Sequence, residues 1–135
     1  MSERSYWRKL RGDLDPRGFY VRVENEVDPG TPDVHWCLNA QSGWIENKFF
    51  PVVPTRDDSY PLMRHHPILD TQMDWIDEYL ERGGRVSILI GVAYKFTLAY
   101  PGSLVRRLNE CTWRELQALG IEIPAKSRIN PLELP

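Results

Sequence analysis

The sequence is poor in several features that define whole classes of protein. It has only two cysteines, Cys37 and Cys111, in no metal-binding spacing, which argues against a disulfide scaffold and a zinc ribbon. Mean hydropathy is −0.47, and no apolar run approaches the roughly 18 residues that a membrane span needs. The N-terminus, MSERSYWRKLRGDLDP, lacks the apolar core of a signal peptide. We therefore expect a cytoplasmic protein with no membrane partner.

Net charge is low as well. A value of −2 argues against strong general affinity for nucleic acid. The charges are nevertheless unevenly spread. Residues 1–22 carry six basic and three acidic groups, residues 23–81 carry three and twelve, and residues 82–135 carry eight and four. An acidic centre between basic flanks fits a cation-binding centre beside phosphate-binding surfaces. Chance clustering of surface charge is the alternative interpretation.

What is present indicates one globular domain. The 135 residues are 41% hydrophobic and 27% charged, enough for one buried core. Hydrophobic spacing and turn signals predict helices at 2–14, from Asp70 or Thr71 to Gly83, at 104–108 and at 112–119, and strands at 19–23, 34–38, 44–50, 85–92 and 94–100. This order predicts an α/β fold with a mixed β-sheet flanked by helices. The domain is expected to cover residues 1–123, with a long proline-rich loop at 51–67 and a loose tail at 124–135.

The stretch from Glu24 to Lys48 holds the residues that suggest chemistry. Asp33 opens one strand of a predicted hairpin, and Glu46 and Lys48 lie two residues apart on the returning strand. Residues two apart on a strand share a face, so the hairpin can bring all three together on one solvent-open face. Two carboxylates can hold a hard divalent cation, and a lysine can stabilise a developing phosphorane charge.

These residues resemble the signature of the PD-(D/E)XK nuclease superfamily. The resemblance covers roughly residues 2–93. It includes Gly30-Thr31-Pro32-Asp33, Trp44-Ile45-Glu46-Asn47-Lys48, Gln72 at the start of a helix, the Gly83-Gly84 turn and the apolar strand RVSILIGV. The two longer runs are similar to the VRR-NUC branch and to small phage-encoded, archaeal-resolvase-like nucleases. The resemblance implies a restriction-endonuclease-like fold.

It also implies roles for individual residues. Asp33, Glu46 and the backbone carbonyl of Asn47 would hold Mg²⁺, with Mn²⁺ able to substitute, and Lys48 would position the attacking water. Gln72 would lie at the rim of the same site. Many relatives carry a further acid on the first helix. Glu24 is the preferred residue for that place in this sequence, and Glu3 is the other option.

The implied function is a Mg²⁺-dependent endodeoxyribonuclease. Its substrate would be branched or structured DNA, such as a Holliday junction or flap. RNA is the alternative substrate. A homodimer would supply the two active sites that symmetrical cutting of a four-way junction requires. The chain would act in the host-cell cytoplasm if a phage encodes it. The alternative is a non-catalytic nucleic-acid- or protein-binding module with a nuclease-like fold.

Each residue also has a simpler interpretation. Asp33 could cap a turn after proline, and Glu46 with Lys48 could form an exposed ion pair. Gln72 could be an ordinary helix residue. The adjacent His65 and His66 lie in the loop with no third soft ligand nearby, so contact with phosphate is their only expected functional role; His35 is expected to be structural.

Overall fold

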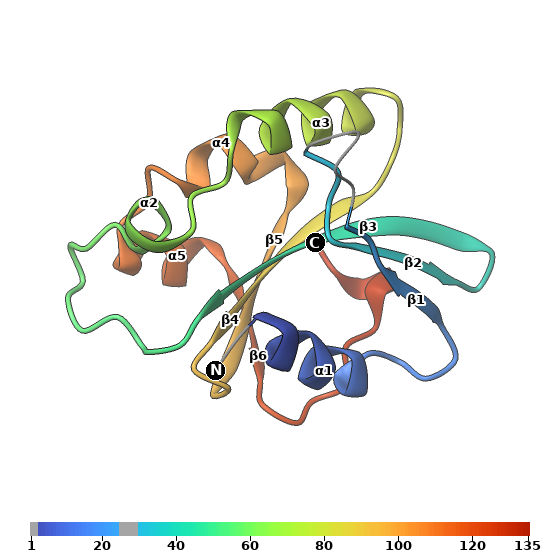
Figure 1. Ribbon diagram of the computed structural model, residues 1–135, viewed down its shortest axis with the longest axis horizontal. Coiled ribbons are helices and arrows are strands. Elements are labelled where there is room, and N and C mark those ends of the chain that lie inside the picture. Colours follow the sequence, from blue (N-terminus) through green and yellow to red (C-terminus); the bar gives the residue numbers. More distant parts are fainter. Residues whose placement is uncertain (1–2, 25–29) are drawn as a thin grey trace.

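In the described part of the chain, six strands form one sheet in which spatial order follows chain order (Figure 1). The computed structural model describes residues 3–24 and 30–135. The strands are β1 (Phe19–Arg22), β2 (Val34–Leu38), β3 (Gln41–Phe50), β4 (Val86–Val92), β5 (Phe96–Pro101) and β6 (Ile121–Pro124). Neighbours pair antiparallel except β3 and β4, which are parallel. The sheet is therefore mixed, as the sequence predicts.

Helices cover both faces of the sheet (Figure 1). They are α1 (Glu3–Asp13), α2 (Pro61–His65), α3 (Asp70–Glu81), α4 (Val105–Leu108) and α5 (Trp113–Leu119), with single 3₁₀ turns η1 (Gly102–Leu104) and η2 (Pro131–Glu133). The long connection through α2 and α3 allows β3 and β4 to run parallel, because a parallel pair needs a crossover. None of the helices in the described residues is long and apolar enough to cross a membrane.

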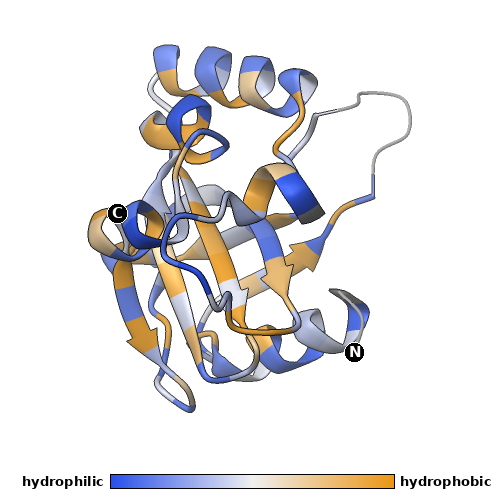
Figure 2. Ribbon diagram, turned by 90° about the vertical axis from the view of Figure 1, so that its left-hand side faces the viewer, coloured by the Kyte–Doolittle hydropathy of each residue, from blue (hydrophilic) through white to orange (hydrophobic). Residues whose placement is uncertain are grey.

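The sheet separates two hydrophobic cores. One packs α1 on β1–β3 through Tyr6, Leu10 and Phe49, and the other packs α3–α5 on β3–β5 through Ile76, Leu116 and others. β4 is buried along its whole length, as expected for a strand covered on both faces. Figure 2 shows hydrophobic colouring concentrated on the central strands and on the helix sides that face them.

Two hairpins turn through residues with left-handed backbone conformation. Asn39 and Ala40, with φ of 57° and 61°, join β2 to β3, and Ala93 and Tyr94, with φ of 51° and 57°, join β4 to β5. Two consecutive positive φ values are typical of the type I′ turn, whose twist matches the flanking strands. β3 consequently begins at Gln41, three residues earlier than the sequence predicts.

The sequence-based expectation differs from the structure at two further places. The proline-rich segment 51–67 contains helix α2, which begins at Pro61; proline is favoured in a first helical turn because its missing N–H needs no partner there. The segment 124–135 is not loose. β6 joins the sheet edge, and Ile129 is buried and exchanges backbone hydrogen bonds of 2.9 Å with Asp13 and Asp15 beside α1.

Candidate active site

Strand β3 carries Glu46, Asn47 and Lys48 through the middle of the sheet. It pairs with β2 on one side and, in register Glu46↔Ile88 and Lys48↔Ile90, with β4 on the other. Strand alternation directs Glu46 and Lys48 to the face covered by α3, while Phe49 packs toward α1 against Tyr6.

Glu46 and Lys48 are buried, contrary to the solvent-open face expected from the sequence. Glu46 is 1% exposed and Lys48 is 8% exposed. The Lys48 Nζ lies 3.8 Å from Glu46 Oε1, so each charge has an opposite charge beside it. Burying either ion alone would be expensive, and the pair compensates part of that cost. The interpretation as an exposed surface ion pair is therefore wrong.

Gln72 bridges helix α3 and Glu46. Its Nε2 donates a 2.8 Å hydrogen bond to Glu46 Oε1, and its Oε1 accepts one of 2.9 Å from the backbone N–H of Leu69, just before the helix. One side chain thus satisfies an orphan donor at the helix start and holds the carboxylate below it. The structure brings Gln72 and Glu46 together, as the sequence-based site requires.

Asp33 lies beside the same stretch of β3. Val34 and Ile45 form the last pair of the β2–β3 ladder on this side, and Asp33 directly precedes β2. Its Oδ2 accepts a 2.9 Å hydrogen bond from the backbone N–H of Asn47. Asp33 is thereby fixed next to the Glu46–Asn47 peptide, and its backbone carbonyl accepts from Val23 N–H at 2.6 Å.

Gly30 explains part of the Gly-Thr-Pro-Asp run. Its φ is +100°, and a Cβ built there would lie 2.2 Å from the backbone oxygen of Thr71. Only glycine tolerates both the positive φ and that approach. The segment before Asp33 therefore packs directly on the start of α3, where Gln72 follows Thr71.

The third acid is less closely tied to the site. Glu24 follows β1, its side chain is 79% exposed, and its ion pair is with Arg22, at 3.8 Å. The side chain of Glu3, like that of His65, lies outside the described residues. His66 is exposed just after α2. His35 makes an edge contact with Trp44 at a centroid distance of 4.9 Å, which fits its expected structural role.

Trp7 and Arg22 lie beside Asp33 and were not predicted as site residues. A small polar hollow is lined by Trp7, Arg22, Asp33, Val34 and Asn47. The Asn47 Oδ1 is buried there and has no hydrogen-bond partner among the described residues. Arg22 brings a cation close to Asp33 because it pairs with Val34 across β1 and β2. The available signal was its place near the end of the strand predicted at 19–23, which pairs with the strand that follows Asp33.

The donor set suits a hard cation. Asp33 and Glu46 offer carboxylate oxygens, and Mg²⁺ usually takes one or two protein carboxylates and completes its shell with water and substrate phosphates. Across residues 3–24 and 30–135, no three His, Cys, Asp or Glu side chains cluster as a metal site. A site made of Asp33, Glu46 and the Asn47 carbonyl would offer oxygen ligands only, which would suit Mg²⁺ better than Zn²⁺.

Comparison with known proteins adds evidence on the fold. No protein-family model matches the chain, and no curated protein sequence matches it either. A solved structure does: Hjc, a Holliday junction resolvase from the archaeal hyperthermophile Archaeoglobus fulgidus, with a TM-score of 0.50 and 14% sequence identity over 90% of this chain and 84% of that one. The predicted fold class is confirmed: this is a single α/β domain with a restriction-endonuclease-like mixed sheet.

Proposed function

We propose that the protein is a divalent-metal-dependent nuclease that cleaves phosphodiester bonds in branched or structured DNA. One observation carries this proposal above the others. Gln72 and Lys48 both contact the buried Glu46, while Asp33 is hydrogen-bonded to the backbone of the adjacent Asn47. Burying a carboxylate and an ammonium at one place costs stability, and a site whose charges act in catalysis explains why such an arrangement is present.

The proposed roles follow from the chemistry of each group. Asp33, Glu46 and the Asn47 carbonyl would hold Mg²⁺ or Mn²⁺, which when bound polarises the scissile phosphate and lowers the pKa of a bound water. Lys48 would orient the attacking water and stabilise negative charge on the phosphate. Gln72 would keep Glu46 in place through the 2.8 Å hydrogen bond. Glu24 would approach the site as the third acid.

The substrate and assembly are the finer part of the proposal. The structural likeness to a Holliday junction resolvase and the PD…ExK resemblance, which extends to VRR-NUC and phage-type nucleases, together support branched DNA. Two active sites are needed to cut a four-way junction symmetrically, so we propose a homodimer with two-fold symmetry. The activity would belong in the cytoplasm, or in the host-cell cytoplasm for a phage-encoded chain.

A binding module without catalysis is the second candidate. The observation in its favour is access, because Glu46 and Lys48 are 1% and 8% exposed. A catalytic site must admit the scissile phosphate, so α3 or the segment before Asp33 would have to move away from Glu46 and Lys48. A binding module would need no such movement.

Cleavage assays separate the two functions. Labelled four-way, flap, linear and single-stranded substrates, as DNA and as RNA, are incubated with Mg²⁺, with Mn²⁺ and with EDTA. The proposal expects metal-dependent cleavage that favours the branched DNA and disappears in Asp33→Ala. Binding without cleavage under every metal condition would reject the nuclease in favour of the binding module. The mass of the protein in solution, measured by light scattering, tests the dimer.

A further inference from the structure

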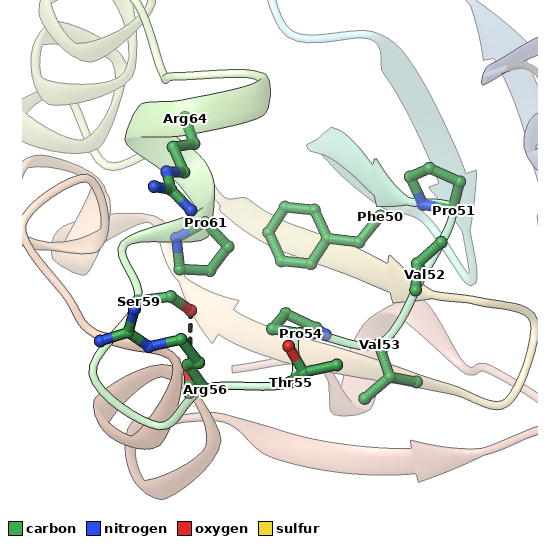
Figure 3. Close-up of a pocket in the computed structure, with 10 residues that line it drawn as sticks. All are labelled: Phe50, Pro51, Val52, Val53, Pro54, Thr55, Arg56, Ser59, Pro61 and Arg64. Carbon is green, nitrogen blue, oxygen red and sulfur yellow. Dashed lines mark hydrogen bonds between the residues drawn. The ribbon is translucent and has the colours of Figure 1, made fainter.

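A pocket opens where β3 ends (Figure 3). Its volume is about 270 Å³, and most of its wall is apolar, including the ring of Phe50 and those of Pro54 and Pro61. Arg56 and Arg64 stand at its rim, and Figure 3 shows their side chains on the same side of the pocket, opposite Val52. Apolar walls with a few charged groups are typical of a small-ligand site.

The wall of the pocket is held in place by the fold. The segment between Pro54 and Pro61 is fastened to the start of α5, because Ser59 and Asp57 carbonyls accept hydrogen bonds from Trp113 N–H at 2.8 Å and Arg114 N–H at 3.1 Å. The Ser59 hydroxyl also donates to the Arg56 carbonyl at 2.8 Å. A ligand would meet a pocket that is already formed, which lowers the entropic cost of binding.

The two arginines differ in whether their charge is already paired with a carboxylate. Arg56 is paired with Asp58 through hydrogen bonds of 3.1 and 3.0 Å, and this contact lowers the pKa of the Asp58 carboxyl. Arg64 is exposed and makes no ion pair with any described residue. The pocket therefore combines an apolar interior with one cation at its rim that is available to an anion. This combination suits a ligand that has a flat apolar part next to a phosphate, and a guanidinium is well shaped to hold phosphate oxygens.

The pocket lies next to the candidate active site. Phe50 follows Lys48 by two residues on β3 and so shares its sheet face, roughly 7 Å further along the strand. A polynucleotide whose phosphate reached Lys48 would place a neighbouring nucleotide near Phe50 and Arg64.

We infer that this pocket binds one unpaired nucleotide of the DNA substrate, with its base against Phe50, Pro54 and Pro61 and its phosphate on Arg64. This inference rests on the proposed nuclease function and specifies its substrate: DNA with an unpaired nucleotide beside the bond that is cut. Fully paired DNA keeps its bases stacked and cannot fill the pocket without paying to extrude one. Recognition would thus depend on the structure of the DNA and not on its sequence.

The nucleotide pocket is tested by measuring binding separately from cleavage. The probes are a DNA hairpin with one unpaired 2-aminopurine nucleotide and the same hairpin fully paired. Binding is followed by fluorescence in EDTA, where no metal-dependent cleavage occurs. The variants are Arg64→Ala, which removes the cation, and Thr55→Trp, which fills the pocket from an exposed position. Arg82→Ala is the matched control, because Arg82 is an exposed helix-end arginine outside the pocket.

The expected result is a preference of wild type for the unpaired probe. Emission of the 2-aminopurine should rise on binding, because the base leaves the helix stack. Arg64→Ala should weaken binding of the unpaired probe roughly tenfold, as loss of one charge-assisted contact does. Thr55→Trp should abolish the preference while paired DNA still binds, and Arg82→Ala should behave as wild type.

Equal binding of the two probes by wild type would overturn the inference, even if the protein cleaves branched DNA. Loss of paired and unpaired binding to the same extent in Arg64→Ala and Arg82→Ala would overturn it too, because that result indicates general phosphate affinity. Conversely, a pocket-dependent preference in a protein that cleaves no substrate would support the nucleotide pocket and reject the nuclease.

Discussion

The amide of Gln72 connects the start of α3 to Glu46 on β3 through hydrogen bonds of 2.9 and 2.8 Å. Gln72→Glu should keep the acceptor that Leu69 N–H uses but place a carboxylate against Glu46. We expect a loss of stability from like-charge repulsion and a larger increase in melting temperature with Mg²⁺ than wild type shows, because a cation would relieve the repulsion. Thermal unfolding with and without Mg²⁺ measures both effects. Equal metal responses in the two proteins would argue against a cation beside Glu46.

Lys48→Met should destabilise the fold as well as stop cleavage. The side chain keeps its length and apolar packing but leaves Glu46, 1% exposed, without its neighbouring cation. Breaking a buried pair costs about 3–5 kcal/mol, and the 3.8 Å separation suggests the lower end of that range. Urea unfolding gives the stability change. A variant as stable as wild type would mean that the pair contributes little, as on an open surface. Mg²⁺ affinity should be unchanged or higher, because a cation has been removed from the site.

Asp33→Asn and Asp33→Ala form a matched pair. The asparagine can still accept the hydrogen bond from Asn47 N–H, 2.9 Å in wild type, but it carries no charge. We expect it to retain most of the stability, whereas the alanine loses about 1 kcal/mol for the missing hydrogen bond. Both should lose cleavage and the metal-induced rise in melting temperature. Metal-dependent cleavage by the asparagine variant would show that Asp33 has a structural role only.

Gly30→Ala tests the packing of the Asp33 segment on α3. The new methyl would lie 2.2 Å from Thr71 oxygen at a φ of +100°, so it should cost at least 1–3 kcal/mol of strain. Gly12→Ala is the control, because nothing lies within 4 Å of its added Cβ and its helix should gain up to about 1 kcal/mol. The denaturation midpoint should fall in Gly30→Ala and rise in Gly12→Ala. Loss of cleavage should accompany only Gly30→Ala.

The Asp15–Arg17 contact predicts a pH dependence of stability. Hydrogen bonds from the Arg17 side chain and backbone lower the pKa of Asp15 from 3.8 to about 2. Because the folded pKa is the lower one, the contact stabilises the fold fully above about pH 4, and this contribution disappears as pH falls toward 2. Wild type and Asp15→Asn should therefore differ in melting temperature near neutral pH and converge in acid. A difference that persists unchanged in acid would contradict this account.

Local patterns predicted much of the fold. The β2 boundaries, the start of α5 with its Thr112–Glu115 capping box and the buried β4 all follow from alternation, apolar runs and capping residues. β6 and the packing of Ile129 could not be found in this way, because both depend on surfaces contributed by distant parts of the chain. The type I′ turn was missed for a local reason, because Ala40 is a residue type with no preference for positive φ.

In the candidate site, too, local features were predicted from the sequence and long-range packing was not. Spacing placed Glu46 and Lys48 on one face, and the predicted cap at Asp70 or Thr71 together with the family resemblance pointed to Gln72 at a helix start. It could not show that α3 lies close enough over β3 to bury both charges, since burial depends on the packing of the whole helix. It also missed the rim arginines of the pocket beyond Phe50, because the prolines in this segment indicate only an irregular loop.

The parallel pairing of β3 with β4, which differs from the other strand pairs of the described sheet, has a consequence for the order of folding. β1–β3 and β4–β6 are each connected by antiparallel pairing. We expect β3–β4 pairing to join the two halves only after the crossover through α3 is in place. Local hairpins form in microseconds, whereas pairing between distant segments is slow. Asp33 and Glu46 belong to the first half, and Gln72 belongs to the crossover. A chain that has formed only its hairpins therefore has the two acids without the glutamine that holds Glu46, and cleavage during refolding should begin no earlier than α3 docks on β3.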